Sequence, residues 1–174
     1  MEIPIVYETV EGQTRRIVEF VEERISSAGH AVRLFNTKDK LGEVSFDDID
    51  KVILAAPVHE RRHPKGFEVF VSASRDTLKA CQTLLISVSL KAAFPEGQEA
   101  AQDYLTEMKM RTGLDPDREV LTAGAVRTSS YGYFESQVVQ NVILGDRQVD
   151  LIDGVREFTD WDALAAEIDR FLIS

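Results

Sequence analysis

The stretch from Ile3 to Ile17 constrains the fold of this chain more than any other. It joins a short apolar run, a turn with a glycine and the start of an amphipathic helix. Ile3, Ile5 and Val6 form the apolar run, as expected for a buried parallel strand. A helix that begins directly after such a turn presents free backbone N–H groups and the positive end of its dipole. This geometry binds phosphate, although an ordinary strand-to-helix turn has the same outline.

The residues of the turn strengthen the phosphate hypothesis. Thr9 and Thr14 can supply hydroxyl donors, and Gly12 lets the backbone approach an anion without a Cβ in the way. The string is not the G-x-G-x-x-G of dinucleotide-binding folds, and it lacks the lysine of a P-loop. It resembles the FMN-phosphate loop of flavodoxins in the residues Thr9, Val10, Glu11, Gly12, Gln13 and Thr14. Flavodoxins usually have threonine where Glu11 stands, so this acid must turn away from a bound phosphate.

Length and composition indicate one soluble globular domain. The chain has 174 residues, of which 44% are hydrophobic and 29% charged. It contains no apolar window of transmembrane length and no signal-peptide pattern, so we expect a chain that begins near Met1 and stays in the cytoplasm. The single cysteine, Cys81, excludes an internal disulfide and a cysteine metal cluster. Its place before an apolar run predicts a buried, inert thiol.

The net charge of −10 limits the partners that this chain can have. Affinity for nucleic acid requires clustered lysine and arginine, so a nucleic-acid partner is not expected. An anionic membrane surface would repel the chain on average. An acidic surface suits an electron carrier that docks basic partner proteins, although a charge excess is also the usual property of a solvated surface.

Strand and helix patterns alternate along the chain. Beyond the first strand, the apolar patterns predict strands at 31–35, 51–56, 83–90 and 119–126, and helices at 14–28, 67–78 and 95–113. Such alternation implies right-handed βαβ units and a parallel sheet covered on both faces. Five strands with a phosphate loop after the first predict an α/β fold of strand order 2-1-3-4-5. Ligands then lie at the carboxyl ends of the strands, which places loops 8–13, 57–62 and 87–93 at the site.

The stretch from about 127 to 158 goes beyond a minimal fold of this kind. Tyr131, Phe134, Val138 and Val142 are spaced as on one face of a helix. Residues 148–152 alternate and predict a short strand or an extended loop. The closing helix is expected to begin at 159–161, with Thr159 or Asp160 as its N-cap. We therefore expect one domain over residues 1–174, with an insertion before its last helix.

Five short strings together resemble one branch of the flavodoxin superfamily, the flavodoxin-type, quinone-dependent protoporphyrinogen IX dehydrogenases. These strings lie at 11–15, 67–71, 87–90, 123–127 and 159–161, in the order in which that family has them. The first string alone indicates only a flavodoxin-like chain. The later strings AGAVR and TDW narrow the resemblance to this branch.

The resemblance implies a non-covalent FMN whose phosphate binds the first loop. It further implies that the flavin ring lies between Pro57, Val58, His59 and Glu60 on one side and Ser87, Val88, Ser89 and Leu90 on the other. The substrate would then be a porphyrinogen and the electron acceptor a quinone. The insertion would shape the access of either molecule to the flavin.

The chain departs from the family pattern in two places. The loop after the third strand, at 56–63, has no tryptophan or tyrosine to stack on a flavin, and no glycine for the peptide flip of flavodoxins. The expected helix at 131–144 has no lysine or arginine, whereas the family is basic there. We therefore expect little membrane contact. Its apolar stripe is expected to pack on this domain's own sheet or on a second copy, through Phe134, Val138 and Val142.

Three residues of the second loop are candidates for chemistry. His59 can bond flavin or substrate, or act as a general acid–base, but a solvated loop histidine fits the sequence equally well. His63 is expected to be solvated. A metal site built from His59, Glu60 and His63 is not expected, because these residues share the loop with two arginines.

Several other polar side chains are candidates for ligand contacts. Arg61 and Arg62 can bind a carboxylate such as a porphyrin propionate, although plain surface charge is the simpler hypothesis. Arg127, at the end of the fifth strand, is the better candidate for a catalytic or substrate contact. Ser87 and Ser89 are expected to bond flavin, since no base is placed to make either a nucleophile.

The leading hypothesis is an FMN-dependent oxidoreductase similar to protoporphyrinogen IX dehydrogenase. A flavodoxin-type electron carrier without its own substrate is the alternative, with a redox partner protein in place of the porphyrinogen. A flavin-free binding module is the third hypothesis, and the unusual second loop keeps it open.

Overall fold

One parallel five-stranded sheet forms the centre of the molecule. The computed structural model describes residues 1–39, 44–127 and 155–174. The strand order is β2-β1-β3-β4-β5, and every neighbouring pair is parallel. The strands are β1 (Glu2–Tyr7), β2 (Ala31–Asn36), β3 (Lys51–Pro57), β4 (Gln82–Ser89) and β5 (Arg118–Ala123). The predicted α/β fold with strand order 2-1-3-4-5 is confirmed.

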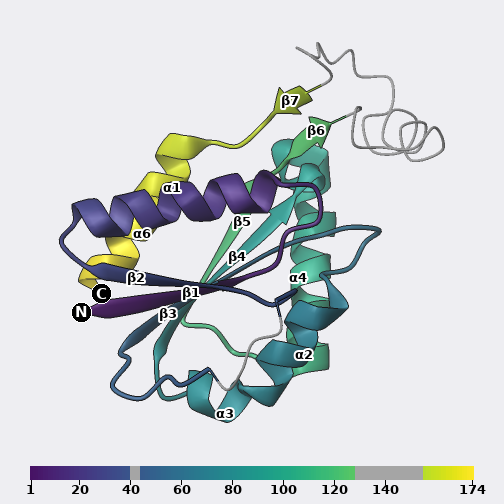
Figure 1. The fold of residues 1–174 in the computed structure, drawn as a ribbon. Helices are drawn as coiled ribbons and strands as arrows, with labels where there is room; N and C mark the ends of the chain where they lie inside the picture. The colour runs from purple at the N-terminus through teal and green to yellow at the C-terminus, as the bar shows by residue number, and fades with distance from the viewer. Residues whose placement is uncertain (40–43, 128–154) are drawn as a thin grey trace.

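Helices cover both faces of this sheet (Figure 1). On one face lie α1 (Gln13–Ser27) and α6 (Trp161–Ile173). On the other lie α2 (Lys65–Ala73), α3 (Arg75–Leu78) and α4 (Gln98–Thr112). Two 3-10 turns, η1 (Leu90–Ala93) and η2 (Pro95–Gly97), connect β4 to α4.

Alternate side chains of each central strand enter two separate cores. Ile3 and Ile5 of β1 pack in the cluster that contains α1 and α6, whereas Val6 packs with α2 and α4 on the other face. All three residues are fully buried. Burial on both faces explains why the strands are nearly continuous apolar runs, as in other doubly covered parallel sheets.

Two of the predicted helices differ from the structure in their bounds. The helix expected at 67–78 is divided at Ser74, whose ψ of 5° ends α2 before α3 begins. Serine is a weak helix former because its hydroxyl competes for backbone groups. The helix expected at 95–113 opens with the tight turn η2, becomes α-helical at Gln98 and is capped by Gly113 at φ 72°.

The fifth strand ends earlier than the sequence predicts. It stops at Ala123, and Gly124 then donates its N–H to the carbonyl of Ser89. The next residues form β6 (Ala125–Arg127), which pairs antiparallel with β7 (Val155–Glu157) as a separate ribbon. The expected helix at 131–144 and the strand or loop at 148–152 lie outside the described residues.

The last helix begins as the sequence predicts. Asp160 is the N-cap of α6, and its carboxylate accepts a hydrogen bond of 2.9 Å from the backbone N–H of Ala163. Among the helices in the described part of the chain, none combines the length and the apolar character that crossing a membrane requires.

Candidate functional site

Three loops meet at the carboxyl edge of the sheet. The loops that follow β1, β3 and β4 are neighbours there because these three strands lie side by side in parallel. Backbone bonds hold the strand ends in register: Glu8 N–H donates to the Ala55 carbonyl at 3.1 Å, and Val58 N–H donates to the Val88 carbonyl at 2.7 Å. The predicted ligand loops therefore share one edge.

Near the end of the first loop the backbone takes a left-handed conformation that favours glycine. Gly12 has φ 93° and is the N-cap residue of α1, and no described side chain caps this helix. Its N–H donates to Thr9 Oγ1 at 3.0 Å. A Cβ placed on Gly12 would meet nothing within 4 Å, so open space borders the backbone at the helix start. An uncapped helix start beside open space is suited to an anion.

Two side chains of the first loop, those of Glu11 and Gln13, contact other parts of the protein. The Glu11 carboxylate lies 3.7 Å from Nδ1 of His59 on the second loop. The Gln13 amide donates to Glu157 and to Thr159, each at 3.0 Å. Glu11 thus reaches towards the second loop, and Gln13 reaches towards the segment before α6.

The second loop contains a tight turn at its tip. The backbone N–H of His59 donates to the Arg62 carbonyl at 2.9 Å, and the Arg62 N–H donates back at 3.1 Å. The two central residues, Glu60 and Arg61, have φ values of 49° and 66°. Positive φ at both central positions is the pattern of a type I′ turn, which normally contains asparagine and glycine. His59, Glu60 and Arg61 are all exposed at this turn.

The prediction that His63 is solvated is wrong. Its side chain is only 1% exposed, and its Nε2 lies 2.8 Å from Oγ of Ser87 in β4. Burial lowers the pKa of His63 to about 4. Its Nδ1 has no partner among the described residues. The imidazole is thus neutral near pH 7 and anchors the base of the second loop to β4.

A buried carboxylate supports this anchor. Glu68 in α2 is 5% exposed and accepts hydrogen bonds from Arg62 at 2.8 Å and from Arg111 at 2.6 Å. Burial alone would raise the pKa of Glu68, but these two guanidinium groups outweigh it and lower the pKa below its ordinary value. Arg62 is therefore bound to α2, whereas Arg61 has no ion pair among the described residues.

The third loop is compact and largely buried. Ser87 and Val88 lie near the end of β4 on opposite faces of the sheet, and Ser89, the last residue of the strand, accepts a hydrogen bond of 3.2 Å from the N–H of Lys91. Leu90 begins the turn η1. Both serine hydroxyls thus have protein partners already, although a hydroxyl has the capacity for more than one bond.

Three further features singled out in the sequence are the Arg127 side chain, a metal cluster and Cys81. The backbone of Arg127 pairs with that of Val155 in the β6–β7 ribbon. Among the described residues no three His, Cys, Asp or Glu side chains form a metal cluster, so His59, Glu60 and His63 do not gather. Cys81 is buried, and burial raises the pKa of its thiol, as the sequence predicts for an inert cysteine.

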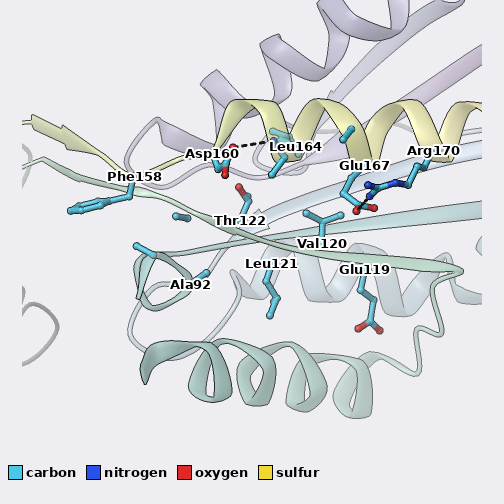
Figure 2. A pocket seen from close by; sticks show the side chains of 14 residues that line it. Ala92, Glu119, Val120, Leu121, Thr122, Phe158, Asp160, Leu164, Glu167 and Arg170 are labelled. Carbon is cyan, nitrogen blue, oxygen red and sulfur yellow. Dashed lines mark hydrogen bonds and ion pairs between the residues drawn. The ribbon is translucent and has the colours of Figure 1, made fainter. Parts of the chain in front are cut away.

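A groove of about 600 Å³ lies beside β5, away from the first two loops. It runs between the edge of β5 and helix α6, and Figure 2 shows Thr122 and Val120 on the strand facing Leu164 and Glu167 on the helix. Only Ala92 and Ala93 of the predicted ligand loops line it. Glu167 is already bound to Arg118 and Arg170. The groove therefore does not coincide with the site predicted from the sequence.

Comparison with known proteins identifies the family. The sequence model of the flavodoxin domain matches residues 4–148. The chain belongs to the flavodoxin-domain family. The comparison with curated proteins finds no match.

Solved flavodoxins have the same fold as this flavodoxin-domain chain. Oxidised flavodoxin 1 from Bacillus cereus matches with a TM-score of 0.59 at 13% identity, over 99% of this chain and 98% of its own. A Fusobacterium nucleatum flavodoxin bound to flavin mononucleotide matches with a TM-score of 0.52 at 15% identity, over 99% and 95% of the two chains. At such identities the likeness shows the fold alone.

Within this flavodoxin-domain chain, no sequence pattern predicts the contacts of His63, Glu157 and Thr159. His63 follows two arginines and precedes a proline, a context typical of an exposed loop. Glu157 and Thr159 lie about 145 residues after Gln13, whose amide they bind, with separations of 144 and 146. Trp161 also donates to Glu157, at 2.8 Å. The two Gln13 bonds join the segment before α6 to the first loop.

Proposed function

We propose that this chain binds FMN at the carboxyl edge of its sheet, with the phosphate at the start of α1. The observation that carries the proposal is the backbone at Gly12. No described side chain caps the helix that begins there, and open space borders its left-handed backbone. The phosphate would bind Thr9, Val10, Glu11, Gly12, Gln13 and Thr14, chiefly through backbone N–H groups. The ring would lie between Pro57, Val58, His59 and Glu60 and the opposite loop Ser87, Val88, Ser89 and Leu90.

The proposed activity is that of an FMN-dependent oxidoreductase similar to protoporphyrinogen IX dehydrogenase, with a quinone as acceptor. Bound FMN supplies the electron-transfer chemistry, and the protein supplies binding, orientation and electrostatics. The sequence resemblance over most of the chain supports this choice. Arg61 is exposed at the tip of the second loop, and its guanidinium would supply a partner for a carboxylate of an acidic substrate.

A flavodoxin-type electron carrier is the second candidate. Its support is the net charge of −10, which would steer a basic redox partner towards the protein. A carrier would exchange electrons with a reductase and would have no turnover of its own. The dimer expected through residues 131–144 is a separate proposal, which light scattering on the full chain tests.

The binding proposal is tested by titrating the full chain with FMN, using calorimetry and the visible spectrum. Gly12→Val should weaken FMN binding by about tenfold or more, which corresponds to about 1.4 kcal/mol. Gly29→Val is the matched control, because Gly29 at the far end of α1 also has positive φ and open space around it. Both variants should lose similar stability, but only the first should lose affinity. If the unmodified chain shows no heat and no spectral change, it is a flavin-free module.

The activity proposal is tested under anaerobic conditions with FMN-loaded protein, protoporphyrinogen and a soluble quinone. The enzyme hypothesis predicts porphyrin formation that depends on the protein and on the quinone. The same rate with and without protein contradicts it. Reduction by a flavodoxin reductase without porphyrin turnover supports the carrier.

A further inference from the structure

The first two loops of the proposed site are joined by one acidic and one imidazole side chain. Glu11 Oε1 lies 3.7 Å from Nδ1 of His59, with the side chains 24% and 41% exposed. They come from the loops after β1 and β3, which are adjacent strands. The phosphate function does not use the Glu11 carboxylate, since that function needs only the backbone N–H of this residue. The contact with His59 therefore points to a role of this carboxylate in the second loop.

The position of Glu11 favours one tautomer of His59. A carboxylate beside Nδ1 stabilises the form that carries its proton there, and this form leaves the lone pair on Nε2. The separation of 3.7 Å is longer than a direct hydrogen bond, but such contacts often shorten when a site is filled. The backbone of His59 is held on both its N–H and its carbonyl by Arg62. Only rotation of the two side chains is then needed to close the pair.

No other charged group of the second loop has the described contact with His59 that Glu11 has. Arg62 is bound to Glu68 at 2.8 Å. Glu60 and Arg61 are exposed at the central positions of the turn. Within the described chain, Glu11 is the carboxylate that lies within ion-pair distance of His59.

We propose that Glu11 is a positioning residue that holds His59 as a base, with Nε2 accepting the proton that an organic donor releases on oxidation. The proposal rests on the proposed function, in which FMN would accept two electrons together with one of the donor's two hydrogens, as a hydride. The bond between the donor and its other hydrogen breaks, its electron pair forms the new double bond of the oxidised donor, and an Nε2–H bond forms. Because His59 is partly exposed, the proton then leaves to solvent. Glu11 in the first loop and His59 in the second loop would thus act together in removing this proton.

The tautomer is measured on uniformly ¹⁵N-labelled full chain by long-range ¹H–¹⁵N NMR, at about pH 8, above the ordinary titration range of histidine. The chain has three histidines, and His59→Gln assigns the signals of this one. We expect a protonated Nδ1 and an unprotonated Nε2 in the parent. Glu11→Thr should shift the population towards the Nε2–H form. Glu23→Gln, which removes a charge from an exposed position of α1, should leave the population unchanged. The same tautomer in the parent and in Glu11→Thr would overturn the proposal.

A second measurement separates this inference from the proposed function. The FMN dissociation constant is determined for the parent, Glu11→Thr and His59→Gln, followed by the anaerobic rate of donor oxidation against pH. With FMN bound, His59→Gln should slow oxidation by about 10²- to 10⁴-fold, and Glu11→Thr should shift the pH profile. Failure of the parent to bind FMN contradicts the proposed function, whereas the NMR result stands by itself. An unchanged rate in FMN-loaded His59→Gln overturns the inference alone.

Discussion

Nε2 of His63 lies 2.8 Å from Oγ of Ser87, which ties the base of the second loop to strand β4. Both side chains are almost completely buried, at 1% and 0% exposure. Burial lowers the pKa of His63 from its ordinary value of 6.5 to about 4, while Glu68 opposes this shift and Arg111 adds to it. The folded protein therefore holds a neutral imidazole under the proposed flavin site at neutral pH.

This buried histidine makes stability depend on pH. The unfolded chain takes up a proton on His63 near pH 6.5, but the folded chain does so only near pH 4, so acid favours unfolding. The contribution of His63 to the free energy of unfolding is constant above about pH 7 and falls by about 3 kcal/mol towards pH 4. Urea unfolding at intervals of pH should show this loss in the parent.

The matched variant for that experiment is His63→Gln, which keeps a polar partner for Ser87 and has no titration. The carboxylates titrate in both proteins, so their effect cancels in the difference between the two curves. We expect the variant to be less stable at neutral pH and to approach the parent as the pH falls. Parallel curves would show that His63 is accessible to protons in the folded state.

The sheet and the placement of its ligand loops were predictable because they depend on local patterns. The apolar run of Ile3, Ile5 and Val6 specifies a strand buried on both faces, and Gly12 marks the turn that follows. Once five such strands alternate with helices, the handedness of crossovers leaves few possible orders. The carboxyl edge then follows from the topology.

The contacts within the loops were not predictable, because they join residues that are distant in sequence. His63 contacts Ser87, which lies 24 residues later in the sequence. No pattern in the charged string before Pro64 indicates that His63 is buried. The direction of the Glu11 side chain likewise depends on where the second loop places His59. The packing of the whole fold determines which of these residues meet, and a local sequence pattern carries no information about that packing.

The buried carboxylate of Glu68 provides the second stability prediction. Glu68→Gln should destabilise the protein by about 2 kcal/mol at neutral pH, because it removes the negative charge shared by Arg62 and Arg111 and replaces one of the two acceptor oxygens by an amide donor. This figure is below the full cost of breaking a buried pair, since the two arginines are 55% and 32% exposed. The difference from the parent should shrink in acid, because the lowered pKa of Glu68 stabilises the fold only while the carboxyl is ionised.

Glu107→Gln is the control for Glu68→Gln. Glu107 also pairs with Arg111, at 3.8 Å, but it is 58% exposed on the surface of α4. We expect it to cost less than about 0.5 kcal/mol. Equal losses in the two variants, measured by urea unfolding, would show that burial of Glu68 has no energetic consequence.

A close backbone approach gives the third prediction. A Cβ on Gly97 would overlap the carbonyl oxygen of Lys91 and lie 2.9 Å from its carbonyl carbon. Gly97→Ala should therefore displace η1 and cost about 1 to 3 kcal/mol. Gly124→Ala is the control, because its Cβ would meet Val88 at an ordinary contact distance of 3.5 Å. If thermal unfolding shows no difference between the two alanine variants, the turn after β4 is not packed as tightly as the structure shows.

The turn at the tip of the second loop gives the last prediction. Glu60 and Arg61 occupy left-handed backbone positions, where a residue with a side chain costs about 1 to 2 kcal/mol. Glu60→Asn combined with Arg61→Gly gives the turn the residues that its geometry favours. Glycine also adds freedom to the unfolded chain, which offsets part of the gain, so we expect a net increase of about 1 kcal/mol in the free energy of unfolding.

The control for the turn is Glu60→Gln combined with Arg61→Ala, which removes the same two charges without relieving the backbone. We expect no gain from it, because glutamine and alanine at positive φ are strained as glutamate and arginine are. Urea unfolding of the three proteins, with m-values compared, separates relief of strain from a change in the unfolded state. If Glu60→Asn combined with Arg61→Gly is no more stable than the parent, at an equal m-value, the bonds between His59 and Arg62 hold the turn without strain.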